Sequence, residues 1–228
     1  SGHSNCYNQC AMRLLLITQK VDRNDPVLGF FHRWIEVFAS RVEQITVICL
    51  EKGDVQLPAH VRVLSLGKER RKSRAAYLRL FFVYVWRERK NYDTVFVHMN
   101  QVYVLLGGAL WRLLGKKIIL WYAHKSVTIT LRIALLLVHA VCTASPESFR
   151  ISSDKVHVLG HGIDTEAFRF SKKQRGDVFR IVSVGRISPI KGYDVLLTAV
   201  ENLVEEGVDL DVVIVGGPVT TDDEVYAH

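Results

Sequence analysis

Short apolar runs alternate with longer segments of helical period along most of this chain. The runs that predict strands are six or seven residues long and lie at residues 12–18, 44–50, 60–66, 93–99, 116–122, 140–145 and 155–160. Apolar residues recur at helical spacing between them, at residues 30–40, 74–90, 104–114 and 130–137. This alternation is typical of a doubly wound parallel sheet with helices on both faces. The pattern therefore predicts an α/β fold.

The pattern lapses at residues 164–177, where charged residues and Gly176 interrupt the apolar periodicity. It resumes with an apolar run at 178–184, a helical segment, and a second apolar run at 210–216. One strand, one helix and a second strand cannot bury both faces of a sheet. We therefore expect a tag or disordered leader, a complete domain, a linker and the start of an incomplete second domain, at residues 1–11, 12–164, 165–177 and 178–228 respectively.

The composition is that of an ordinary globular protein, with 49% hydrophobic and 23% charged residues, and it excludes disordered and fibrous classes. The four cysteines form no CxxC pair, so neither a disulfide framework nor a zinc site is predicted, and a reducing compartment is expected. No apolar run approaches the roughly 20 residues that span a bilayer. The opening SGHSNCYNQCA lacks the apolar segment of a signal peptide.

The charge is distributed unevenly. The chain carries +7, but residues 178–228 contain three basic and nine acidic residues, net −6, which leaves +13 for residues 1–177. The densest basic stretch, residues 68–90, has nine Lys or Arg and two Glu with aromatic residues between them. It fits an interfacial helix that meets anionic lipid, a nucleic-acid-binding face, or a core helix with solvated basic ends.

The stretch VGRISPIKG, residues 184–192, joins a predicted strand to a predicted helix. Turns at the carboxyl ends of strands are where open α/β sheets bind ligands. Ser188 is expected to cap the helix and Pro189 to occupy its first turn. Arg186 offers a bidentate guanidinium and Lys191 a point charge, beside the free N–H groups of the helix start. Alone, the turn predicts an anion site, with a solvated basic helix cap as the alternative.

Three motifs in order support a closer assignment: VLGHGIDTEAF at 158–168, VGRISPIKGYDVLLTAV at 184–200 and VVIVGGP at 212–218. Together they closely resemble the nucleotide-sugar-dependent glycosyltransferases of family 4, which have the GT-B fold of two Rossmann-like domains. The resemblance is detailed in the second half of the chain and rests on β/α layout and local matches in the first. It implies a retaining hexosyltransferase that uses a UDP- or GDP-linked donor and a hydroxyl of a glycan or lipid-linked acceptor, with no cofactor and no required metal.

The resemblance implies a donor site in the second domain. Arg186 and Lys191 correspond to the family residues that hold the donor diphosphate, and Gly185 allows the backbone to approach it. Gly216 and Gly217, at the end of the next strand, complete the implied donor-binding set. Without a metal, the departing diphosphate charge must be stabilised by the two cations and the helix N-terminus.

The resemblance also implies residues at the strand ends of the first domain. His124 stands where the family often carries a histidine that contacts the donor sugar near the reacting carbon, and His98 is its rival. Gly29, in the first strand-to-helix turn, is implied to let backbone amides face the donor or acceptor, with a plain flexible loop as the alternative. Gly162 and Asp164 resemble the family's hinge motif, with a hinge that contacts no ligand as the alternative, and Gly162 is expected to need a backbone conformation closed to bulkier residues.

The chain departs from the family pattern in one respect. We expect the family's acidic E-x7-E motif to lie in the part of the second domain that this chain lacks, so we expect this piece to be inactive by itself. Two other classes remain open: a non-catalytic scaffold that binds nucleotide or sugar, and a nucleic-acid-binding protein, which is not favoured. We expect a cytoplasmic location, with residues 68–90 on the inner face of an anionic membrane.

Overall fold

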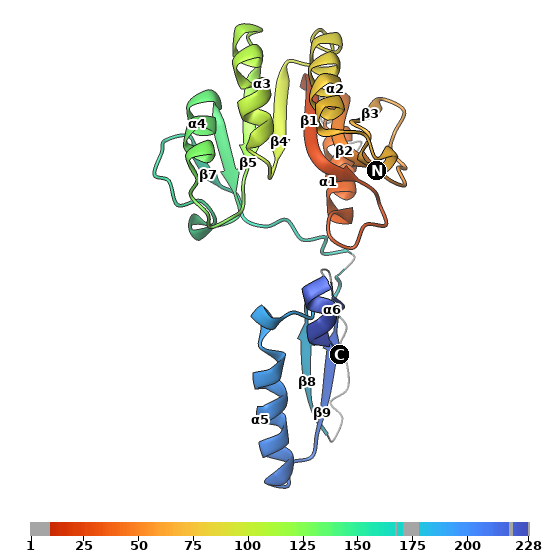
Figure 1. The fold of residues 1–228 in the computed structure, drawn as a ribbon, viewed down its shortest axis with the longest axis vertical. Helices are drawn as coiled ribbons and strands as arrows, with labels where there is room; N and C mark the ends of the chain where they lie inside the picture. The colour runs from red at the N-terminus through yellow and green to blue at the C-terminus, as the bar shows by residue number, and fades with distance from the viewer. Residues whose placement is uncertain (1–9, 167, 171–177, 219–220, 228) are drawn as a thin grey trace, which may run out of the picture. The chain divides into compact units, whose positions relative to one another are not determined.

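The computed structural model describes residues 10–166, 168–170, 178–218 and 221–227 and contains two units that divide between Gly162 and Ile163. The elements of the first unit, in chain order (Figure 1), are β1 (Cys10–Val21), α1 (Gly29–Ala39), β2 (Val42–Lys52), β3 (Val61–Ser65), η1 (Lys68–Arg70), α2 (Arg74–Arg87), β4 (Thr94–His98), α3 (Val102–Leu113), β5 (Lys117–Trp121), α4 (Ile129–Leu137), β6 (Ala140–Thr143), η2 (Pro146–Ser148) and β7 (Val156–Val158). The seven strands and four helices predicted for this unit are confirmed.

The leader predicted at residues 1–11 is partly wrong. β1 begins at Cys10 and pairs there with Val42 of β2, so the last two residues of the predicted leader belong to the sheet. Residues 1–9 lie outside the described part of the chain, as do residues 167 and 171–177 of the predicted linker.

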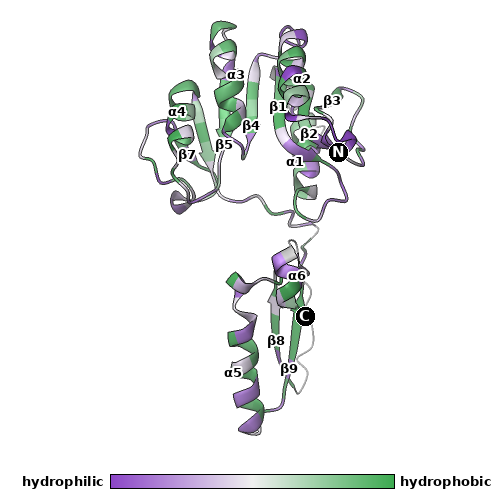
Figure 2. Cartoon of the chain, in the orientation of Figure 1, coloured by the Kyte–Doolittle hydropathy of each residue, from purple (hydrophilic) through white to green (hydrophobic). Residues whose placement is uncertain are grey.

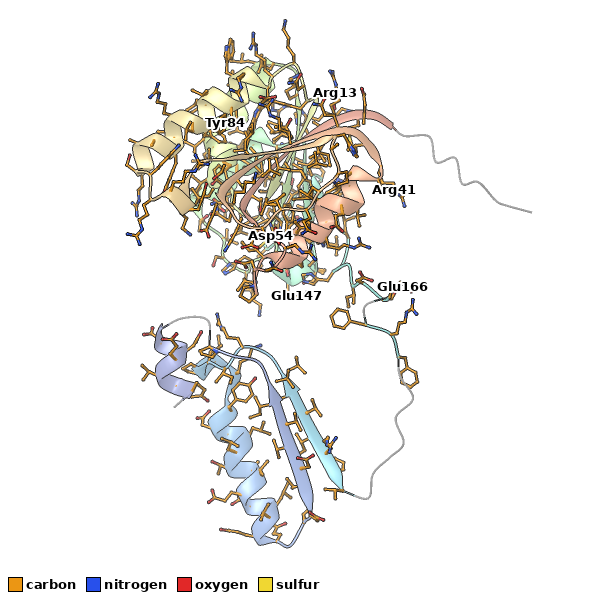
Figure 3. All side chains as sticks on the ribbon, turned by 90° about the vertical axis from the view of Figure 1, so that its right-hand side faces the viewer. Arg13, Arg41, Asp54, Tyr84, Glu147 and Glu166 are labelled. Atoms are coloured by element: carbon orange, nitrogen blue, oxygen red, sulfur yellow. The ribbon has the colours of Figure 1, made fainter. Side chains whose placement is uncertain are left out.

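All seven strands of the first unit form one parallel sheet in the order β3-β2-β1-β4-β5-β6-β7. The strand order runs outward from β1 in one direction through β3, then returns to place β4 on its other side. This reversal makes the boundary between β1 and β4 the topological switch point, where sheets of this type bind ligands at the carboxyl ends of the strands. Asp54 and Glu147, which follow β2 and β6, lie at this carboxyl edge (Figure 3).

Successive side chains of a strand point to opposite faces of the sheet. Each face of this sheet packs against its own hydrophobic core. Leu15 and Ile17 of β1 join the core formed with α2, α3 and α4, whereas Leu14 and Leu16 join the core formed with α1. The first of these cores contains Trp111, which is fully buried. Each large apolar side chain removed from water in this way contributes about 1.5–3 kcal/mol.

The second unit contains β8 (Phe179–Val184), η3 (Pro189–Lys191), α5 (Tyr193–Glu205), β9 (Leu210–Val215) and α6 (Thr221–Ala227). β8 and β9 pair in parallel over their full length, and α5 alternates hydrophobic and hydrophilic positions (Figure 2). Among the described residues this sheet has two strands, and apolar side chains such as Phe179 and Val184 stay 70% and 77% exposed. The predicted strand, helix and strand are confirmed, and they leave much apolar surface uncovered.

Candidate functional site

The turn after β8 is held against the end of β9 by backbone hydrogen bonds. The N–H of Gly185 donates to the carbonyl of Val215 at 2.9 Å, and the N–H of Ile187 donates to the carbonyl of Gly217 at 3.1 Å. Each bond joins one residue of the predicted donor turn to the VVIVGGP motif. The two motifs found in the sequence therefore form one local structure.

Gly216 can only be glycine in this arrangement. A Cβ atom built on Gly216 would lie 1.8 Å from the carbonyl oxygen of Gly185, and the φ of Gly216 is +155°. The contact is with backbone, which cannot turn aside as a side chain could. Gly217, by contrast, has open space where a Cβ would lie. The close approach packs the ends of β8 and β9 together without a side chain between them.

The two cations of the turn differ in their surroundings. The Nε of Arg186 lies 3.6 Å from a carboxylate oxygen of Asp223, a buried residue in the first turn of α6. Lys191 lies over Gly185, since a Cβ built on that glycine would be 3.9 Å from the lysine Nζ. Lys191 is exposed, and among the described residues no carboxylate lies within ion-pairing distance of it. The structure thus provides one cation held in place and a second that is open to an anion.

The predicted start of the following helix is wrong. Pro189–Lys191 form a short 3-10 turn, and α5 begins at Tyr193, four residues after Pro189, with Gly192 as its N-cap at φ +62°. Ser188 makes no capping hydrogen bond; its side chain is 1% exposed and its hydroxyl has no partner among the described residues.

The hydroxyl of Tyr226, in α6, is hydrogen-bonded at the start of α5. The N–H of Asp194 donates to the hydroxyl of Tyr226 at 3.1 Å, and that hydroxyl donates to the carboxylate of Asp194 at 3.0 Å. Because α6 supplies this partner, one of the amides predicted to face an anion is already bonded. Of the groups predicted to face an anion, the side chains of Arg186 and Lys191 therefore remain.

In the first unit, His98 lies at the switch point. It ends β4, is 2% exposed, and its Nδ1 is hydrogen-bonded to the hydroxyl of Thr18 in β1 at 3.2 Å. Its ring stacks on Phe31 of α1, with 4.0 Å between ring centroids. Burial lowers the pKa of His98 to about 4, so the ring is neutral at physiological pH. Its Nε2 is buried with no partner in the described part of the chain.

His124 lies at the same edge but in a different environment. It is exposed in the loop after β5, its Nδ1 accepts the N–H of Ser126 at 3.1 Å, and its own N–H donates to the carbonyl of Ser148 at 3.0 Å. β4 and β5 are neighbours in the sheet, yet no hydrogen bond or ring contact between described residues joins His98 to His124. The structure leaves His124 accessible to a substrate and encloses His98.

Gly29 is the first residue of α1, and its amide is occupied. Its N–H donates to the carbonyl of Asp25 at 3.0 Å, and a Cβ at this position would lie 3.1 Å from the carbonyl oxygen of Arg23. The carboxylate of Asp25 accepts hydrogen bonds from the backbone N–H groups of Val27 and Leu28, just before Gly29, at 2.9 and 2.7 Å. An acidic side chain of the protein thus holds the amides that the resemblance assigns to a ligand.

Lys20 pairs with three carboxylates at this loop. Its Nζ lies 2.8 Å from Asp25, 3.1 Å from Glu51 and 3.5 Å from Asp22. The hydrogen bond from Lys20 lowers the pKa of Asp25, and the same contacts raise the pKa of Lys20. The first turn is therefore fixed by its own charges.

At the exit from the first unit, the residue with a left-handed backbone is Gly160, with φ +79°, and Gly162 has no positive φ. The conformation expected at Gly162 is therefore wrong by two positions. Asp164 is exposed and its carboxylate accepts the N–H of Glu166 at 3.1 Å. The two units divide immediately after Gly162, and both residues lie at this division.

Two negative findings apply to the described residues. No group of three or more His, Cys, Asp or Glu side chains is arranged to hold a metal ion. No helix in this part of the chain has the length and apolar character needed to cross a bilayer.

Structural comparison identifies related folds at low sequence identity. HepE from Anabaena, in complex with UDP, is 13% identical with a TM-score of 0.59, over 93% of this chain and 71% of HepE. The apo lipopolysaccharide outer core galactosyltransferase WaaB is 12% identical with a TM-score of 0.58, over 94% of this chain and 63% of WaaB. The N-terminal domain of Candida albicans trehalose-6-phosphate phosphatase is 13% identical with a TM-score of 0.62, over 96% of this chain and 67% of that domain's chain. These likenesses show a fold of the GT-B type.

Sequence comparison gives the family. No curated protein sequence matches the chain. The family described as "Glycosyl transferases group 1" matches residues 164–226, the part that contains the predicted donor turn. The family described as "Glycosyl transferase 4-like" matches residues 25–141, more than half of the chain. With these matches and the GT-B type of fold, the chain belongs to the glycosyl transferase 4-like family.

Proposed function

We propose that this chain binds a nucleoside-diphosphate sugar in its second unit and transfers the sugar, with retention of configuration, to a hydroxyl acceptor. The observation that carries the proposal is the turn after β8. There Arg186 and Lys191 flank a backbone that approaches the end of β9 so closely that Gly216 admits no side chain. HepE, a structural neighbour, has been solved with UDP and with UDP-glucose, which supports a UDP-linked donor; a GDP-linked donor is the alternative.

The proposed transfer requires the turn to stabilise the negative charge of the departing diphosphate. Lys191 supplies a charge that no described carboxylate neutralises, and Arg186 supplies a guanidinium fork positioned by Asp223. Both charges are in place before the reaction, so they stabilise the developing negative charge without reorganisation. Arg186 and Lys191 therefore take the role that a metal ion has in other transferases, and we propose that no metal or other cofactor is required. Gly185 and Gly217 allow the diphosphate to approach the backbone.

In a retaining transfer the acceptor hydroxyl attacks from the face that the leaving group vacates. We propose that the leaving phosphate itself accepts the acceptor proton, while His124 orients the donor sugar through its exposed ring. Its accessibility at the carboxyl edge supports this role. His98, buried and neutral, is better suited to holding β1, β4 and α1 together at the switch point. We assign Gly162 and Asp164 to the hinge between the units.

The acceptor is proposed to be a glycan or a lipid-linked molecule at the cytoplasmic face of a membrane. The support is α2, whose exposed positions follow one stripe along the helix. This stripe consists of Arg74, Ala75, Leu78, Arg79, Phe82, Val83, Trp86 and Arg87. Large apolar residues between arginines suit an anionic lipid surface. Phosphate backbones of nucleic acids need the charges but not the apolar residues, so nucleic-acid binding is not favoured.

The donor test is a thermal-shift screen of the protein with UDP-, GDP- and ADP-sugars. A ligand of the folded state at 100 times its Kd adds about 2.7 kcal/mol to the free energy of unfolding. We expect one sugar nucleotide to raise the Tm. The double variant Arg186→Ala, Lys191→Ala is expected to weaken binding about 100-fold or more, because it removes two charge-assisted contacts.

Arg180→Ala is the control. This variant also removes a positive charge from the second unit, but Arg180 pairs with Asp211 away from the turn. This variant should keep the wild-type ligand shift. The absence of a shift with every sugar nucleotide, or an unchanged shift in the double variant, would contradict the proposal. Binding without sugar transfer to any acceptor would instead support a non-catalytic scaffold.

A further inference from the structure

A pocket of about 320 Å³ lies in the first unit between α2 and α3, beside the carboxyl ends of β1 and β2. Most of its wall is apolar or aromatic, and Tyr77, Phe81, Tyr103 and Leu106 contribute to it. Its volume is at the lower end of the range for small-molecule sites, so the pocket can hold one part of a larger ligand. It lies on the opposite face of the sheet from His98, because Gln19, which lines it, follows Thr18 in β1.

One strong charge borders this apolar space. Arg74, the first residue of α2, lines the pocket. Two other basic residues of the same stretch have acidic partners: Lys68 pairs with Glu51, and Arg87 pairs with Glu88. Arg74 has no such carboxylate within the described residues. A pocket with an apolar wall and an uncompensated guanidinium is suited to a molecule with an apolar part and an anionic group.

The pocket continues onto the outside of α2. Leu78 lines the pocket and is also 44% exposed on the helix surface. One turn further along the same stripe are Phe82 and Val83, and a further turn brings Trp86, which is 53% exposed. Figure 3 shows α2, marked by Tyr84, with its side chains along the outside of the first unit. An apolar chain can therefore extend from the pocket over Leu78 toward the surface proposed to meet the membrane.

We propose that this pocket binds the acceptor, and that the acceptor is an amphiphile whose anionic group pairs with Arg74 and whose hydrocarbon chain starts in the pocket and leaves over Leu78. The assignment rests on the proposed function, because it makes the pocket the acceptor site of the transferase. It narrows the acceptor from any glycan or lipid-linked hydroxyl to a membrane lipid with a phosphate or carboxylate close to its hydroxyl. Asn100, which follows β4, lines the same pocket at the carboxyl edge of the sheet.

The test measures binding of decyl phosphate, decanol and inorganic phosphate to the protein by titration calorimetry, with decyl phosphate below its micelle concentration and no sugar nucleotide present. We expect decyl phosphate to bind at least about tenfold more tightly than either of the other two probes, since only it engages both the charge and the apolar wall. Arg74→Gln should weaken decyl phosphate binding about tenfold and leave decanol unchanged. Leu106→Trp, which fills the pocket, should weaken both.

Arg79→Gln is the matched control, because it removes the same charge from the same helix at a position that does not line the pocket. Equal weakening by Arg74→Gln and Arg79→Gln would mean general surface charge and would overturn the proposal. So would unchanged binding in Leu106→Trp, or decyl phosphate binding no tighter than inorganic phosphate. If Leu106→Trp fails to fold, the comparison of the two exposed arginines still decides.

The outcome is independent of the donor site. The double variant Arg186→Ala, Lys191→Ala should bind decyl phosphate as the wild type does. Loss of decyl phosphate specificity with an intact sugar-nucleotide shift would remove only the acceptor assignment. A missing sugar-nucleotide shift with intact decyl phosphate specificity would remove the transferase proposal and leave an amphiphile site.

Discussion

The first strand-to-helix turns of the two units have similar residues but different charge balance. Both lie at the carboxyl end of a strand, and each has a lysine, a proline and a glycine in it or at its ends. Near the end of β1, Lys20 lies within 3.5 Å of three carboxylates, and Asp25 accepts the N–H groups of Val27 and Leu28 before α1. After β8, Lys191 has no carboxylate partner in the described part of the chain.

The difference separates a turn whose charges are paired within the protein from one whose lysine can pair with an anion. A cation surrounded by carboxylates has little net attraction for a phosphate, and a helix start whose amides are bonded has few donors left. The turn after β1 thus fixes the start of α1, where the N–H of Gly29 is bonded to the carbonyl of Asp25. The turn after β8 retains positive charge, and a Cβ on Gly217 beside it would meet open space, whereas one on Gly29 would lie 3.1 Å from the carbonyl oxygen of Arg23.

The largest expected effect tests whether the close backbone approach defines the second turn. Gly216→Ala places a Cβ 1.8 Å from the carbonyl oxygen of Gly185, so the ends of β8 and β9 must separate. We expect the second unit to lose about 3 kcal/mol or more of unfolding free energy, as overpacking against rigid atoms does. Limited proteolysis and urea unfolding of the protein measure the loss.

The matched control is Gly217→Ala, where the added Cβ meets open space. Its unfolding free energy should stay within about 0.5 kcal/mol of wild type. Similar stability in the two variants would show that the contact between the strand ends does not constrain the turn.

The second prediction concerns His98, which joins the switch point of the first unit to α1. Folded His98 takes up a proton only near pH 4, whereas the unfolded side chain does so near 6.5. The unfolded state therefore gains protons as the pH falls from 6.5 toward 4, and stability is lost in that window. At pH 5 this loss is about 2 kcal/mol, since each pKa unit corresponds to about 1.4 kcal/mol.

The measurement is urea unfolding at pH 7.5 and pH 5 for wild type and His98→Gln. The variant cannot titrate at this position, so its free energy of unfolding should fall about 2 kcal/mol less than that of wild type. Carboxylates and other histidines contribute equally to both proteins and cancel in the comparison. Equal losses would mean that His98 is protonated in the folded state.

Much of this fold could be predicted from the sequence because its signals are local. Apolar runs of six or seven residues predicted the strands of the first unit, and the three family motifs predicted that the turn after β8 and the end of β9 belong together. Partners distant in sequence could not be predicted in this way. The pair formed by Thr18 and His98 depends on β1 lying beside β4, and the contact between Arg186 and Asp223 depends on where α6 packs. The start of α5 was misplaced because Gly192, not Ser188, sets the local backbone.

The smallest expected effect separates the two lysines directly. Lys20→Met removes the shared partner of Asp25 and Glu51, whose side chains are mostly buried with it, and should cost about 1 kcal/mol of unfolding free energy. It should leave the sugar-nucleotide shift unchanged. Lys191→Met should do the reverse, with stability within about 0.5 kcal/mol of wild type and a reduced shift. If Lys20→Met weakened sugar-nucleotide binding as much as Lys191→Met, both turns would be anion sites and charge balance would not distinguish them.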